Sequence, residues 1–158
     1  MSDSFSNFER VLLSICFEIQ ARITKRASRL EVPFSPVAPD EVPEGMHMAG
    51  CRASRGQFTL LWGIGREPET GLGLMVELLE ITSTGDTLAS IGLEFSCLES
   101  KLPPRWHGII EVSERSALHH LDIQSYFGFG TDMLELNPKD NEEAEWMIDQ
   151  LMETLLLG

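Results

Sequence analysis

The densest group of side chains that could carry chemistry is His119-His120-Leu121-Asp122. Imidazole and carboxylate groups bind metal ions and transfer protons near neutral pH. On a β-strand, adjacent side chains point to opposite faces, so His119 and His120 could not easily bind one ion. His120 and Asp122 could pair, with His107 across a hairpin. The simpler interpretation is one hydrogen-bonded core histidine and one exposed histidine, and we expect neither a bound metal nor a cofactor.

A carboxylate in an apolar run is the second candidate for chemistry. Glu77 lies between Met75 and Leu79, in a segment that is apolar on both faces. Burying a carboxylate is costly unless it is paired, and carboxylates with shifted pKa values collect at active sites. A position at a sheet edge or at the mouth of a barrel explains Glu77 equally well, so both roles stay open.

The chain lacks the familiar catalytic and nucleotide-binding motifs. Gly63-Ile64-Gly65 has no third glycine at dinucleotide-binding spacing, and no predicted helix follows it. There is also no phosphate-binding lysine loop, no serine nucleophile elbow and no zinc-protease helix. We therefore assign no catalytic residue and favour a non-enzymatic protein.

A small-ligand-binding or enzymatic domain is the alternative. It would need a pocket enclosed by a curved antiparallel sheet. The aromatic and ionisable residues that could line such a pocket are Trp62, Glu77, Trp106, His119 and Tyr126. Large aromatic side chains more often anchor a core than hold a ligand. A deep cavity between these residues would favour the alternative, and a filled core would favour a binding module.

Two amphipathic helices are predicted, one near each end of the chain. Residues 4–26 place apolar side chains at helical spacing, and cations crowd the last turns. The predicted apolar stripe consists of Phe8, Val11, Leu12, Ile15, Ile19 and Ile23. The second helix is predicted from Pro138 to Leu157, with Asn137 as its cap and Pro138 in its first position.

Between the helices lie a proline-rich connector, residues 31–45, and a block in which apolar and polar residues alternate. Period-two alternation predicts strands with one buried face. The predicted strands are 46–53, 57–65, 72–83, 88–97, 107–113 and 117–124. Short turns join most of them, which predicts an α+β fold: a mostly antiparallel sheet of about five or six strands, flanked by the two helices. The length fits one domain, residues 1–158.

The formal net charge of -13 limits the partners. Residues 131–158 contain eight acidic residues and one lysine, whereas residues 1–30 contain five basic and three acidic residues. A negative field repels phosphate backbones and anionic membranes, so we expect binding to neither nucleic acid nor membrane. The N-terminus lacks the pattern of a secretory signal, and three isolated cysteines fit reduced thiols, so we expect a cytoplasmic protein.

Apolar residues outside the helical stripes predict a protein partner. Leu13 and Phe17 lie roughly half a turn from the first stripe, where either a loop of the chain folds over them or they anchor a contact with a partner. Trp146 lies outside the second stripe, and the acidic residues around it would form a rim: Glu145, Asp149 and Glu153. The partner would be a protein, basic in one version and a second copy of the chain in another. The sequence therefore favours a small acidic binding module of the adaptor, chaperone or immunity type.

Overall fold

The sheet of this protein is a meander in which strands that are neighbours in the sequence are also neighbours in space. We describe a computed structural model, which defines residues 7–37, 47–67, 71–97, 103–120, 133–136 and 138–157. Seven strands lie in chain order and every neighbouring pair is antiparallel. The strands are β1 (Ser35–Pro36), β2 (His47–Arg55), β3 (Phe58–Glu67), β4 (Gly71–Ile81), β5 (Thr87–Ser96), β6 (Arg105–Val112) and β7 (Met133–Leu136).

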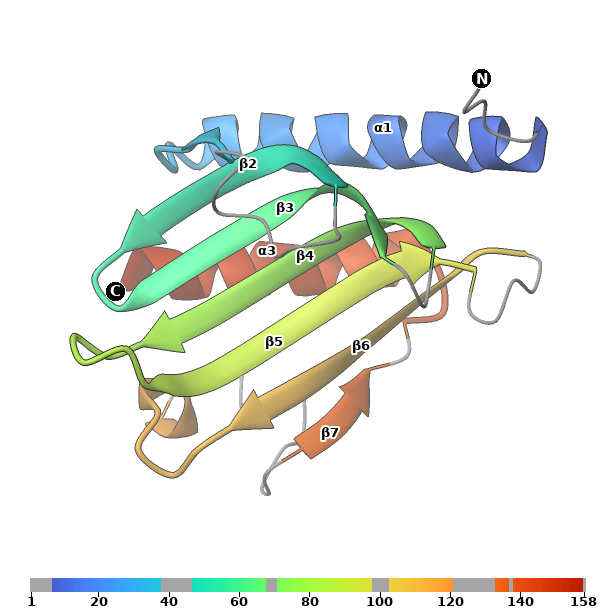
Figure 1. Cartoon of the computed structure of the whole chain (residues 1–158). Helices are drawn as coiled ribbons and strands as arrows, with labels where there is room; N and C mark the ends of the chain where they lie inside the picture. Colours follow the sequence, from blue (N-terminus) through green and yellow to red (C-terminus); the bar gives the residue numbers. More distant parts are fainter. Residues whose placement is uncertain are drawn as a thin grey trace.

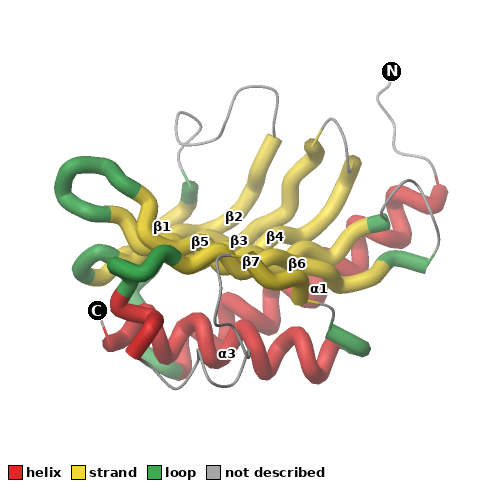
Figure 2. The backbone as a smooth tube through the Cα atoms, turned by 90° about the horizontal axis from the view of Figure 1, so that it is seen from below, coloured by secondary structure: helices red, strands yellow, loops and turns green. Residues whose placement is uncertain are grey.

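The two long helices lie on the same face of this sheet. They are α1 (Asn7–Arg29) and α3 (Asn141–Leu157), and Figure 2 shows both on one side of the strands. Figure 1 looks onto the opposite face, with α3 behind the strands. The predicted α+β class, with an antiparallel sheet and a helix from each end of the chain, is confirmed.

Alternation along the strands explains why one face is covered. Trp62, Val76 and Leu93 are opposite one another on β3, β4 and β5, so their side chains point to the same side. All three are almost completely buried. Their neighbours one residue along each strand point away from the helices. Each strand thus contributes one face to the core and one face to the other side of the sheet.

Helix α1 is rotated slightly from its predicted orientation. Its buried line is Leu12, Cys16, Ile19, Ile23 and Ala27. Val11, which the predicted stripe included, is 60% exposed, and Ile15 is only partly buried. Because each residue advances the helix by about 100°, the line through Cys16 and Ala27 is a better fit to one face. These two small side chains also suit close packing of a helix on a sheet.

The second helix begins three residues later than predicted. Its cap is Asp140, whose Oδ1 accepts a hydrogen bond from the N–H of Glu143 at 2.9 Å. Aspartate is among the best N-cap residues because its carboxylate accepts a free N–H of the first turn. The prediction of Asn137 as the cap and Pro138 as the first helical residue is therefore wrong.

The strand predicted at 117–124 is also wrong where the structure describes it. Residues Ala117–His120 form a short 3₁₀ helix, η3, and 121–124 lie outside the described residues. The buried carboxylate of Glu80 accepts hydrogen bonds from Ser116 Oγ and from the N–H of Ala117, which holds the chain in this turn. Conversely, β7 was not predicted, because four residues in an acidic tail carry little alternation.

The hairpin between β2 and β3 is tighter than predicted. Pairing continues to Arg55 and Phe58, which leaves a two-residue turn of Gly56 and Gln57. Gly56 has a φ of 61°, a conformation that glycine adopts without strain. The predicted turn at Ser54-Arg55-Gly56 is thus displaced by one residue.

Leu93→Asp is expected to abolish the fold. Leu93 is 1% exposed, and an unpaired carboxylate there would cost at least about 4 kcal/mol, a large part of a typical domain's stability. The matched control is Ile109→Asp, because Ile109 is 49% exposed on the opposite face. Far-UV circular dichroism and thermal melting should show an unfolded Leu93 variant and a folded Ile109 variant. Equal melting of the two would mean that the faces are reversed.

Candidate functional site

The face of the sheet that points away from the helices carries the candidate site. Side chains on this face form rows across the strands, because directly paired residues point to the same side. One row, the Gly92 row, includes Arg52, Leu61, Glu77, Gly92 and Ile109. The Glu94 row on one side of it has Met75, Glu94 and His107, and the Ser90 row on the other has Leu79, Ser90 and Glu111. No helix within the described ranges covers these rows.

A hollow lies above Gly92 because this position has no side chain. A Cβ placed on Gly92 would meet no atom within 4 Å. The space has a volume of about 310 Å³ and is lined by side chains from β4, β5 and β6. They include Glu77, Glu94, His107 and Ile109.

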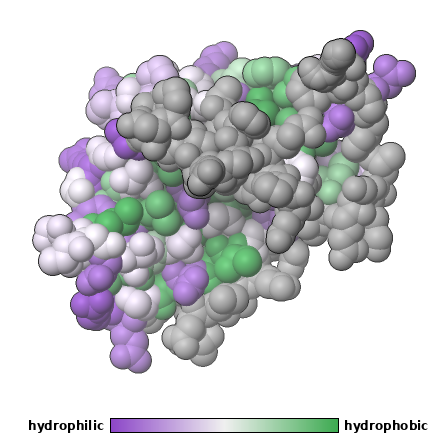
Figure 3. Space-filling view, viewed as in Figure 1, coloured by the Kyte–Doolittle hydropathy of each residue, from purple (hydrophilic) through white to green (hydrophobic). Residues whose placement is uncertain are grey.

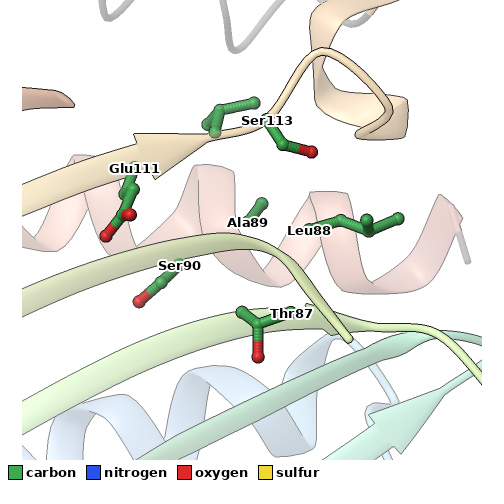
Figure 4. A pocket seen from close by; sticks show the side chains of 7 residues that line it. Thr87, Leu88, Ala89, Ser90, Glu111 and Ser113 are labelled. Carbon is green, nitrogen blue, oxygen red and sulfur yellow. The ribbon is translucent and has the colours of Figure 1, made fainter. Parts of the chain in front are cut away.

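A second hollow of about 380 Å³ continues from the first along β5 and β6. The two share Ser90 and Glu111. Figure 4 shows these two side chains on neighbouring strands, with Thr87 and Ser113 farther along. We call the two hollows together the β5–β6 groove. It runs between the strands from His107 and Glu94 at one end to Thr87 and Ser113 at the other.

A hydrogen bond from Ser90 orients the carboxylate of Glu77 in the groove. Ser90 Oγ donates to Glu77 Oε2 at 3.1 Å, between two strands. Glu77 is half-buried, and an ionised carboxylate can accept several hydrogen bonds. The predicted neighbours Met75 and Leu79 do lie on its face of β4. The predicted position at a sheet edge is wrong, because β4 is the central strand of the seven.

A serine, a histidine and a glutamate meet at one end of the groove, but their geometry is not that of a nucleophilic triad. Ser96 Oγ donates to Glu94 Oε2 at 3.2 Å and lies 3.0 Å from His107 Nε2. The same Nε2 is 3.7 Å from Glu94 Oε2. A triad needs the serine and the carboxylate on different imidazole nitrogens. Ser96 is also only 1% exposed, so this network positions Glu94 and His107 and does not activate a nucleophile.

The groove mixes apolar and acidic surface. Ile109 is 49% exposed, and Leu61, Met75 and Leu79 are partly exposed on the same face. Figure 3 shows hydrophobic and hydrophilic side chains side by side on this face. Ile109, Glu94 and Glu111 were not predicted as site residues. The alternation in 88–97 could have indicated this face of the sheet, because it places Ser90, Gly92, Glu94 and Ser96 on one side of the strand.

The five residues predicted to line one pocket are not brought together. Trp62 and Trp106 are buried against the helices. Their indole nitrogens donate to Thr24 Oγ1 at 3.0 Å and to Asn141 Oδ1 at 2.7 Å. Glu77 points to the opposite face, because it is opposite Leu61 and not Trp62. The side chain of His119 and all of Tyr126 lie outside the described residues. Trp62 and Trp106 therefore cannot share a pocket with Glu77.

The residues predicted to bind a partner fall into two groups. Phe17 is 53% exposed, whereas Leu13 and Trp146 pack against the core. Of the predicted acidic rim, Glu153 is exposed.

The other two acids of the predicted rim join the helices to each other. Arg22 Nε lies 2.9 Å from Glu145 Oε1, and Arg26 Nε lies 2.9 Å from Asp149 Oδ1. Much of the predicted acidic rim thus has cationic partners within the molecule. Their binding role stays a prediction.

Several further features are defined by the described residues. The three cysteines are free, with Cys16 and Cys97 buried and Cys51 partly buried. Within the described part of the chain, no three His, Cys, Asp or Glu side chains are arranged to hold a metal ion. None of the helices there has the length and apolar character needed to cross a membrane.

Comparison with known proteins gives no relative: the chain matches no protein-family model, no curated protein and no solved structure. The function of the chain must therefore be inferred from the geometry of the molecule.

The burial of the Asp149 carboxyl predicts a pH effect on stability. Burial raises the pKa of Asp149 above its ordinary value of 3.8; Arg26 lowers it, and Glu145 and Glu153 raise it. The folded protein thus holds this proton more tightly than the unfolded chain does. Relative to Asp149→Asn, the wild type should lose stability as the pH rises from 3.8 through the raised pKa. Urea unfolding of both proteins across that range measures this difference, and a change of opposite sign would contradict the interpretation.

Proposed function

We propose that this protein is a small, non-enzymatic protein-binding module of the adaptor, chaperone or immunity type, and that the β5–β6 groove is its binding surface. The observation that carries the proposal is Ile109, an exposed aliphatic side chain among carboxylates in a hollow of the sheet. Large exposed apolar side chains in a hollow with a polar rim are typical of protein contact sites.

The alternative of an enzyme or a small-ligand pocket has less support. The two tryptophans that it needs belong to the core, and the Ser96–His107–Glu94 network lacks the geometry of a relay. The two hollows lie along the sheet strands β4 to β6 and have a mixed acidic and apolar lining. A protein segment can use such a surface without being enclosed by it. Three reduced thiols are consistent with a cytoplasmic location, which is part of the proposal.

Ile109→Ser is expected to remove partner binding without unfolding the protein. The matched control is Val11→Ser, because Val11 is an aliphatic residue of similar exposure on α1, far from the groove in the sequence. Affinity capture from the source cell, with cross-linking and mass spectrometry, should find one partner with wild type and the control. That partner should cross-link to β5 or β6 and be lost with Ile109→Ser. Equal capture by all three proteins would contradict the proposal.

Phe17→Ser tests the version in which the partner is a second copy of the chain. Phe17 is 53% exposed, and its removal should not leave a cavity in the core. Leu13 packs against the core, so Leu13→Ser should lower stability and is less informative. If α1 forms a homodimer, sedimentation at micromolar concentration should show a dimer for wild type and a shift to monomer for Phe17→Ser, with an unchanged far-UV spectrum. A wild-type monomer would remove the homodimer through α1 and leave the groove proposal unaffected.

A further inference from the structure

We infer that the β5–β6 groove binds an extended basic segment of the partner, with arginine or lysine at alternate positions. This inference depends on the proposed function, since it names the partner chemistry of the same site. It follows from the spacing of the carboxylates, from the room above Gly92 and from a hydroxyl group at the end of the groove.

The carboxylates occur once in each of three successive rows. Glu94 lies in its own row, Glu77 in the Gly92 row and Glu111 in the Ser90 row. Successive rows on one face are two residues apart, about 6.7 Å. An extended peptide repeats its same-side residues at the same interval. Basic residues at alternate positions of such a peptide would therefore reach one carboxylate per row.

The floor of the groove suits the stems of long basic side chains. Above Gly92 there is open space, and Ile109 lies exposed beside it. Lysine and arginine pack their aliphatic stems on apolar surface while the charged group reaches a polar partner. A purely acidic surface would lack this contact. The groove offers both parts, because Glu77 and Glu111 are on the strands that flank Gly92.

An unpartnered hydroxyl at the far end of the groove independently indicates a bound group. Ser113 Oγ is buried and has no hydrogen-bond partner among the residues that the structure describes. It lines the same hollow as Ser90 and Glu111, and Figure 4 shows it beyond them on the β6 side. Buried polar atoms are nearly always hydrogen-bonded, so an exception requires an explanation. A main-chain or side-chain group of a peptide that follows the groove would supply the missing bond.

Basic residues on the same face decide which carboxylate attracts a cationic peptide most strongly. Arg105 lies on this face one row beyond Glu94 and His107, and Arg52 lies in the Gly92 row, where it pairs with Leu61, the neighbour of Glu77. The two arginines weaken the attraction of Glu94 and Glu77 for a further cation, whereas the described residues paired along the Ser90 row include no basic one. The strongest single contact should therefore be with Glu111, in the Ser90 row.

The probe is a fluorescent synthetic peptide, as long as the groove, in which arginine and valine alternate. Fluorescence anisotropy should show binding to wild type that weakens with salt, because exposed charges are screened within about 10 Å at 0.1 M. Glu77→Gln with Glu111→Gln should weaken binding about tenfold, since each exposed charge pair contributes about two- to fivefold. The matched control, Glu142→Gln with Glu153→Gln, removes the same charge from α3 and should change binding less than about twofold.

Two further comparisons separate this geometry from simple charge attraction. Gly92→Val should fill the hollow and weaken peptide binding, with Gly92→Ala intermediate, and circular dichroism should show both variants folded. A peptide of the same composition with consecutive arginines should bind less tightly. Equal affinity for both peptides, or unchanged binding by the double glutamine variant, would overturn the inference.

The inference and the proposed function can fail separately. If no peptide binds although Ile109→Ser abolishes partner capture, the assignment of a basic segment is wrong and the binding module stands. If wild type sediments as a dimer that Gly92→Val dissociates, the occupant is a second copy of the chain and the inference is also overturned. If peptide binding responds to salt and to the glutamate and Gly92 substitutions as expected, but partner capture does not depend on Ile109, the proposed function is wrong.

Discussion

The placement of both helices on one face of the sheet is the constraint on which the rest of the structure depends. Every strand has two faces, and the helices can bury only one set of alternate residues. Trp62, Val76 and Leu93 belong to that set. The residues between them, such as Glu77 and Gly92, therefore lie on the face that points away from the two helices.

Polar contacts position the helices that the hydrophobic core attracts. The hydrophobic effect has no direction, so burial alone would allow α1 and α3 to slide over the sheet. Trp62 bonds to Thr24 of α1, and Trp106 bonds to Asn141 at the start of α3. Because a buried N–H without a partner is costly, each bond favours one position of its helix. The Arg26–Asp149 pair then links the two helices.

The same sheet geometry explains why the groove lies along β5 and β6. Adjacent strands place Gly92 and Ile109 side by side, so a position with no side chain lies next to an exposed apolar one. Ser90 on β5 orients Glu77 on β4 through a hydrogen bond across the strands. These four residues lie on three strands, and those on different strands are far apart in the sequence. The groove is thus a property of strand pairing and not of a motif.

The sequence by itself determined the class of fold and most of the core. Period-two alternation located β3, β4 and β5, and helical spacing located α1 and α3, because these patterns reflect which side chains must leave water. Elements with little local pattern were not predictable. Ala117–His120 is helical because Glu80, distant in the sequence, binds its first turn, and β7 is a strand because β6 offers it an edge.

Which face of the sheet α1 and α3 leave uncovered, and which side chains gather there, was decided only by the tertiary structure. The sequence indicated that Glu77 shares a face with Met75 and Leu79, but not which strands flank it or which side the helices cover. It therefore grouped Glu77 with Trp62 and Trp106, which the sheet separates. Register between strands sets which residues meet, and register depends on the whole set of turns and pairings. The sequence could thus supply the residues of the groove, while only the folded sheet could assemble them.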